Sequence, residues 1–240
     1  MDVSITQVPI WLSVLFVVCF STFPIFLIAN AAKKALENES LEKGRELRKK
    51  IIIFYWSYLL LIGLLSLAGF FEKNTLPPRI ILASTLPLFL FYLIYVQKTK
   101  WFKSAFKHIK LEQLIFIHIF RFVGVFFFLV YTYNALPKEF AFIGGAGDII
   151  TAILVVPVVI ALKKKLKIAI KLAWIWNFVG ILDIVSVLTT AIILTRAAIE
   201  NNDPGVQQFG TFPFSWIPAF APATIIFLHL LIFKKLRNLS

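Results

Sequence analysis

Cysteine is nearly absent from this sequence: Cys19 is the only one in 240 residues, and it lies within an apolar run. A single thiol excludes an intramolecular disulfide and any metal site built from several cysteines. Acidic residues are also scarce, since 12 Asp and Glu stand against 25 Lys and Arg, for a formal net charge of +13. Charges of both signs are missing from several runs of about 20 residues, the length that spans the ~30 Å hydrocarbon core of a membrane.

Apolar residues are what the sequence has in excess. They make up 60% of it, whereas soluble domains average about 45–50%. We therefore expect an all-α polytopic membrane protein, embedded in the lipid bilayer as a single domain over residues 1–240. Only a helix satisfies its own backbone groups within one apolar segment, so each run is predicted to be a transmembrane helix. The seven predicted spans are residues 8–31, 51–71, 78–96, 111–133, 140–162, 168–195 and 214–233.

Lysine and arginine gather in every second connection between these spans. They fill the stretches 33–50, 98–110 and 163–171 and the tail at 234–237, whereas the other connections hold only Lys73, Arg79, Lys138 and Arg196. The positive-inside rule predicts that the basic connections and the C-terminus are cytoplasmic and that the N-terminus is outside. We expect a multi-pass protein of a bacterial cytoplasmic (inner) membrane. Because topology accounts for the positive charge, we expect no nucleic-acid partner.

Two of the basic stretches have helical patterns of their own. The residues before and within 33–50 are predicted to extend the first two spans as helices, with a break near Gly44. Between Lys98 and Lys110, apolar side chains recur on one helical face and lysines occupy the rest. This spacing favours an interfacial helix lying on anionic lipid headgroups, and a short solvated connector is the alternative. The apolar residues of that face are Trp101, Phe102, Ala105, Phe106 and Ile109.

Ionisable residues inside the predicted spans are few and lie in the C-terminal half. Such residues are costly in lipid and are functional candidates by default. At 1.5 Å per helical residue, Arg121, Asp148 and Asp183 each lie roughly 12–18 Å inside their spans, near the midplane. Because consecutive helices are usually neighbours, we predict that these three side chains form one cluster. Two carboxylates beside one arginine leave an excess negative charge, which makes the cluster a candidate site for a proton or a cation.

Further polar residues share faces with this predicted cluster. His118 precedes Arg121 by three, Thr151 follows Asp148 by three, and Asn177 lies six before Asp183 with Gly180 between them. We predict that Asn177, His118 and Thr151 orient the charged groups, and that a ligand cavity lies among the fourth to seventh helices. The predicted function is binding or transport of a small molecule or ion, with no metal site. The alternative is a structural or accessory protein whose polar knot only fixes helix register.

A haem site is another alternative, although no cofactor is otherwise expected. His118 and His229 lie at similar depths, about 10 Å and about 7 Å from the same predicted face, on the helical rise of 1.5 Å per residue. Equal depth on two helices is the arrangement that bis-histidine ligation of haem iron requires.

The stretch "GAGD", Gly145 to Asp148, resembles the Gly-x-Gly-Asp signature of presenilin, signal peptide peptidase and prepilin peptidase families. The resemblance implies an intramembrane aspartyl hydrolase, with Asp148 and Asp183 as catalytic aspartates that share a proton and activate water. "IPAF", Ile217–Phe220, is similar to the Pro-Ala-Leu motif of presenilin-like proteases. In these families the partner aspartate precedes the motif, whereas Asp183 follows it here.

A longer pattern covers the fourth to sixth spans. The ordered set "RFVG…LPKEFAFIGGAGD…WNFVGILD", from Arg121 to Asp183, is similar to a group of small bacterial seven-helix membrane proteins. This resemblance implies a seven-helix fold and carries no known activity.

Overall fold

The structure, a computed structural model, describes residues 7–37 and 39–239. Within these ranges the secondary structure is entirely helical, and seven segments are long and apolar enough to cross a membrane. The predicted fold class, an all-α bundle of seven membrane spans, is therefore confirmed. The spans occur where the apolar runs predicted them, although several helices are longer because the basic connections continue in helical form.

Five of the spans are continuous helices and two are composite. The continuous ones are α1 (Ile10–Glu37), α2 (Leu41–Leu67), α7 (Lys138–Lys163), α8 (Ala169–Asn201) and α9 (Trp216–Arg237). The third span joins η1 (Ile81–Thr85), α3 (Leu86–Leu90), η2 (Phe91–Tyr95) and η3 (Val96–Lys98). The fourth joins α5 (Leu111–Ile117), η4 (His118–Gly124) and α6 (Val125–Thr132). Two short helices lie between spans: α4 (Lys100–His108) and η5 (Gln207–Gly210).

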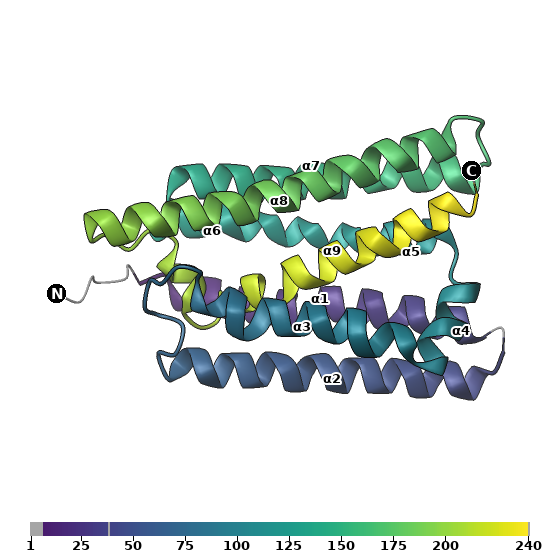
Figure 1. The fold of residues 1–240 in the computed structure, drawn as a ribbon, viewed down its shortest axis with the longest axis horizontal. Coiled ribbons are helices and arrows are strands. Elements are labelled where there is room, and N and C mark those ends of the chain that lie inside the picture. Colours follow the sequence, from purple (N-terminus) through teal and green to yellow (C-terminus); the bar gives the residue numbers. More distant parts are fainter. Residues whose placement is uncertain (1–6, 38, 240) are drawn as a thin grey trace.

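The spans form two groups with α9 between them. Figure 1 shows α1, α2 and the third span on one side, and the fourth span, α7 and α8 on the other. The ribbon of α9 runs diagonally from the first group to the second. Burial agrees with this central position, since 78% of the most apolar 18-residue segment of α9 is buried, against 22% for α8. The core of the protein is therefore built around α9.

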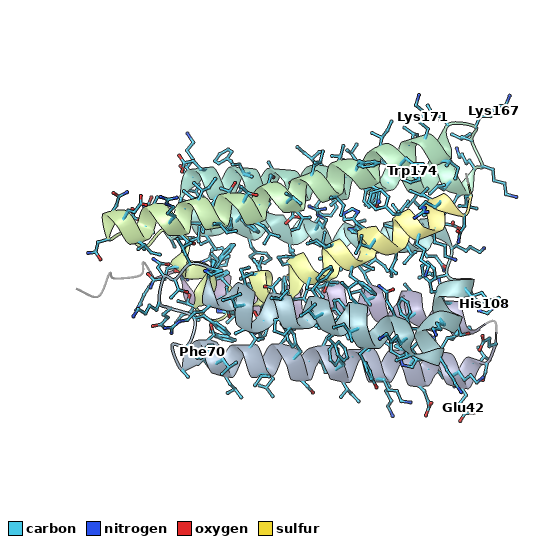
Figure 2. All side chains as sticks on the ribbon, viewed as in Figure 1. Glu42, Phe70, His108, Lys167, Lys171 and Trp174 are labelled. Carbon is cyan, nitrogen blue, oxygen red and sulfur yellow. The ribbon has the colours of Figure 1, made fainter. Side chains whose placement is uncertain are left out.

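The lysine-rich connections gather at one end of the bundle. In Figure 2, Glu42, His108, Lys167 and Lys171 lie toward the end that also holds the C-terminus, and Phe70 lies toward the opposite end. We call the end that holds the C-terminus the basic end. It comprises the α1–α2 connection, α4, the α7–α8 connection and the last turn of α9. The alternation of charge thus corresponds to two ends of one bundle. That the basic end faces the cytoplasm remains a prediction of the positive-inside rule.

The predicted break near Gly44 is wrong. The helices separate before α2, where the Ser40 side chain accepts a hydrogen bond from the Lys43 backbone N–H at 3.4 Å and caps the helix. Gly44 lies inside α2, and a Cβ atom there would approach the Lys33 carbonyl oxygen to 2.9 Å. The glycine therefore allows α1 and α2 to approach closely and does not end a helix.

The predicted amphipathic helix is present as α4. Its apolar side faces the bundle in part, since Ala105 and Ile109 are buried while Trp101 is 39% exposed. The helix also contacts the α1–α2 connection, because the Ser104 hydroxyl donates to the carboxylate of Glu39. Its predicted contact with anionic lipid headgroups remains a prediction.

Candidate functional site

Arg121 is fully buried and is the centre of the polar cluster. It lies in η4, a tightened 3₁₀ segment in the middle of the fourth span. Its Nε donates to Asp148 Oδ1 at 2.6 Å, and its Nη2 donates to Asp183 Oδ2. Asp148 comes from α7 and Asp183 from α8. The three charged side chains that the depth estimate placed together do meet, and their role in binding a ligand remains a prediction.

The third guanidinium nitrogen is also occupied. Nη1 of Arg121 donates to the Gly180 carbonyl oxygen at 3.3 Å and lies 3.5 Å from His229 Nε2. A guanidinium has five N–H donors, and every nitrogen that carries them has a partner within the protein. Arg121 therefore holds the two carboxylates, and each of its three guanidinium nitrogens has at least one partner within the protein.

Asn177 contacts a histidine and not the carboxylates. Its Nδ2 donates to the His229 carbonyl oxygen at 3.3 Å, and its Oδ1 lies 2.7 Å from His229 Nδ1. Because the amide oxygen only accepts, Nδ1 of His229 donates, which leaves Nε2 to accept from Arg121. The partner of Asn177 is thus on α9, and its predicted role in orienting the charged groups stays a prediction. Asn177 orients His229, and His229 in turn lies against the guanidinium.

His118 is buried without a hydrogen bond. Neither of its ring nitrogens has a partner in the described part of the chain. Its ring centroid lies 4.2 Å from that of His229 and 5.1 Å from that of Trp176. The ring of His118 thus packs against α9 and makes no hydrogen bond to a carboxylate of the described chain, and its predicted role in orienting the charged groups stays a prediction. The same contact disfavours haem ligation, since the two imidazoles touch and leave no space for a porphyrin between them.

Thr151 contributes its backbone to the site. Its carbonyl oxygen accepts a hydrogen bond from Trp176 Nε1 at 3.0 Å, which ties α7 to α8. This contact links the two helices that carry the aspartates, and the predicted orienting role of Thr151 stays a prediction.

The glycines of "GGAG" lie inside α7 and pack the helices together. A Cβ atom on Gly124 of η4 would lie 2.7 Å from Asp148 Cβ and 3.0 Å from the Gly145 carbonyl oxygen. A Cβ on Gly145 would in turn lie 3.0 Å from the Gly124 carbonyl oxygen, and one on Gly147 would overlap Asp183. Glycine is needed here because the backbones themselves approach, as small residues allow in membrane bundles.

The position of Arg121 also bears on the hydrolase alternative. In an aspartic protease two carboxylates approach one another and share a proton. Here the guanidinium pairs with both Asp148 and Asp183. The geometry therefore favours an ion-paired cluster over a catalytic dyad, and the likeness to the Gly-x-Gly-Asp families rests on short motifs alone.

A sizeable cavity lies beside the polar cluster. A cavity of about 620 Å³ opens between α1, α2, η2, α4, α5 and α9. It is lined by the fourth and seventh spans but not by the fifth and sixth, and around Arg121 glycine contacts and stacked rings bring the helices close together; the predicted ligand cavity among the fourth to seventh helices stays a prediction. Three hydroxyl residues on the cavity wall were not predicted from the sequence. Their position as polar groups within predicted spans was the signal that could have identified them. They are Tyr55, Tyr92 and Thr224.

These three hydroxyl residues form a buried chain of hydrogen bonds. The Tyr55 and Tyr92 hydroxyls are 2.9 Å apart, and the Tyr92 hydroxyl lies 3.0 Å from Thr224 Oγ1. They connect α2, η2 and α9, which are far apart in the sequence. The cavity wall is therefore held together by neutral polar contacts.

Comparison with known proteins identifies a family without an assigned activity. The sequence model of the family described as Domain of unknown function (DUF8737) matches residues 77–237. The match includes every residue of the polar cluster and the part of the cavity formed by η2, α4, α5 and α9, whereas α1 and α2 lie outside it. No curated protein and no solved structure matches the chain.

Proposed function

The chain belongs to the family described as Domain of unknown function (DUF8737), and we propose that it is a membrane protein that binds or transports a small molecule or ion. In this proposal the Arg121–Asp148–Asp183 cluster exchanges a proton or a monovalent cation. The seven apolar spans support a place in a membrane. The family gives no activity, so the proposal is drawn from the chemistry of the cluster.

One observation carries the proposal: two carboxylates, that of Asp148 buried and that of Asp183 partly buried, share a single guanidinium. Asp148 and Asp183 both pair with Arg121, and their side chains are only 9% and 11% exposed. The three groups sum to one excess negative charge when all are ionised. An uncompensated charge is expensive in a low-dielectric interior, so a proton or a cation is needed to balance it.

The alternative of a purely structural polar knot explains less of this arrangement. One Arg–Asp pair would already fix the register of two helices, and a second carboxylate adds charge that the pair does not neutralise. Gly147 makes room for Asp183 at the cost of a smaller helix contact. Because Asp183 is accommodated in this way and leaves the negative charge unbalanced, the arrangement favours exchange of a proton or a cation over a purely structural role.

Infrared spectroscopy tests the proposal without a known substrate. Purified protein in phosphatidylglycerol-containing vesicles is compared between acidic and alkaline buffer, and between sodium and choline salts. We expect a change in a buried carboxyl C=O band, which Asp183→Asn and Asp148→Asn alter. Asp203→Asn, at an exposed aspartate beyond α8, is the matched control. Bands that respond to neither pH nor sodium, or that are unchanged in both cluster variants, contradict the proposal.

We also propose that the basic end faces the cytoplasm of a bacterial cell. The support is the concentration of lysine in the connections at that end. In a Cys19→Ser background, cysteines introduced at Glu42 and at Lys73 are both at exposed positions. We expect a membrane-impermeant maleimide to label Lys73→Cys in intact cells and Glu42→Cys only after lysis. The reverse pattern would invert the topology.

A further inference from the structure

The cavity of about 620 Å³ begins at the basic end and extends into the apolar part of the bundle. Its lining residues on α2 run from Lys43 to Tyr55, a separation of about 18 Å at 1.5 Å per residue. Charged residues thus border one end and hydroxyls the other. The volume lies within the range of about 300–1,000 Å³ typical of small-molecule sites.

The wall between these ends is aromatic and aliphatic. Phe54 of α2, Phe91 of η2 and Phe227 of α9 face the cavity from three directions. The apolar side of α4 closes the basic end, because Phe102, Ala105 and Phe106 also line it. The amphipathic pattern of α4 therefore serves a wall of the cavity, and the Ser104–Glu39 hydrogen bond connects this wall to the α1–α2 connection.

The charged end of the cavity has a positive excess. Lys43, Lys50 and Lys100 line it together with Glu39 and Glu46. Two of the lysines are paired, Lys43 with Glu39 at 3.8 Å and Lys50 with Glu46 at 3.5 Å. Lys100 has no acidic partner among the residues that the structure describes. It is therefore the cation that remains for a ligand.

The cavity is separate from the polar cluster although both use α5 and α9. On α9, Thr224, Phe227 and Leu228 line the cavity, whereas His229 contacts Arg121. On α5 the last residue, Ile117, lines the cavity, and His118 follows it on the cluster side. A ligand in the cavity is thus separated from Arg121, Asp148 and Asp183, none of which lines the cavity.

We propose that this cavity binds a single-chain amphiphile with an anionic head group, such as an ionised fatty acid or a lysophospholipid. The head group lies against Lys100 at the basic end. The acyl chain lies among the aromatic side chains and ends near the Tyr92 hydroxyl. An elongated apolar space with an unpaired cation at one end matches these two parts of the molecule.

Binding of dansyl-undecanoate, followed by fluorescence on the full chain in nanodiscs, tests the apolar part. Ala105→Trp is expected to weaken probe binding about tenfold or more, because the indole fills space that the chain needs. Ala83→Trp is the matched control, since Ala83 is exposed and outside the lining. Asp183→Asn is expected to bind the probe as the unmodified protein does, which separates this proposal from the function of the cluster. Equal binding by Ala105→Trp and Ala83→Trp overturns the proposal.

Competition against the same probe tests the head group. Dodecanoate and lauroyl lysophosphatidylglycerol are expected to displace it, and the stronger of the two identifies a carboxylate or a phosphate head. Dodecanol is expected to compete more weakly. Lys100→Gln, a change at the protein surface that leaves the core intact, is expected to reduce this difference. If dodecanol competes as well as dodecanoate with the unmodified protein, the anionic head group is ruled out.

Discussion

The polar cluster and the cavity are two solutions to burial inside one bundle. Around Arg121 the helices are close, every guanidinium nitrogen has a partner, and glycines remove the space between backbones. On the other side of α5 and α9, aromatic walls border a cavity of about 620 Å³, and the polar groups at its inner end are neutral hydroxyls. A buried ionised group needs partners of opposite charge, whereas a hydrogen-bonded hydroxyl group is stable beside an open cavity. The two regions should therefore respond differently to substitution.

The largest effect is expected at Arg121. Arg121→Leu leaves two carboxylates facing each other in a buried site, which costs about 3–5 kcal/mol when one partner of a buried pair is removed. The free energy of unfolding in mixed micelles measures the loss. Adding Asp148→Asn and Asp183→Asn to Arg121→Leu should restore part of it, because the charges are removed together. If Arg121→Leu alone is as stable as the unmodified protein, the ion pairs of the cluster do not stabilise the fold.

A second test compares close backbone packing in the two halves. Gly124→Ala places a methyl group 2.7 Å from Asp148 Cβ and 3.0 Å from a backbone oxygen, and overpacking of this kind costs about 1–3 kcal/mol. The matched change is Gly63→Ala on α2, where the nearest atom belongs to the Phe212 ring at 3.3 Å. We expect a smaller loss there because the ring is able to move. Unfolding in mixed micelles distinguishes them, and equal losses would remove the contrast in packing.

The hydroxyl chain of the cavity should be worth less than the ion pairs. Tyr92→Phe removes contacts to Tyr55 and Thr224, and a neutral hydrogen bond contributes about 0.5–1.5 kcal/mol net. Tyr95→Phe is the control, since Tyr95 is 60% exposed. Chemical unfolding of the two variants gives the comparison. A loss for Tyr92→Phe as large as that for Arg121→Leu would mean that neutral and charged contacts stabilise the bundle equally.

The smallest effect is expected at the border of the cavity. The Ser104 hydroxyl donates to the Glu39 carboxylate, and this contact, with a smaller contribution from Lys43, lowers the pKa of Glu39 below its ordinary value of 4.5. A lowered pKa means that the contact stabilises the fold above the ordinary value and is lost as the pH falls through the folded value. Glu39→Gln should therefore lower the unfolding temperature slightly at neutral pH, and the difference should shrink as the pH falls through the pKa of Glu39 in the folded protein. A difference that grows on acidification contradicts this assignment.

The spans and the pairing of charges followed from the sequence because lipid leaves few alternatives. An apolar run of this length becomes a helix, and ionised groups near the midplane must find partners of opposite sign. Arg121, Asp148 and Asp183 lie in consecutive spans at similar depth, so their ion pairs could be predicted without knowing how the helices pack. The same physics predicted α4, whose apolar residues recur at helical spacing.

The cavity and the roles of the uncharged polar residues did not follow from the sequence. Asn177 shares a face with Asp183, but its partner depends on the rotation and tilt of α9, which places His229 in between. Tyr55 and Tyr92 resemble other aromatic residues of a membrane helix until η2 brings them together. The space itself is a property of helix crossing and of the position of α4. The crossing angles of the helices cannot be read from any local pattern in the sequence.

The central position of α9 has a consequence for how the protein is made. Its span follows the other six in the chain, so it enters the membrane after Arg121, Asp148 and Asp183 have emerged from the ribosome. Those three residues come from the fourth span, α7 and α8, so their ion pairs use no residue of α9. The arrival of α9 then adds His229 to the cluster and Thr224 to the cavity wall in a single step. The ion pairs of the cluster are therefore complete without α9, whereas the core and the cavity wall both need it.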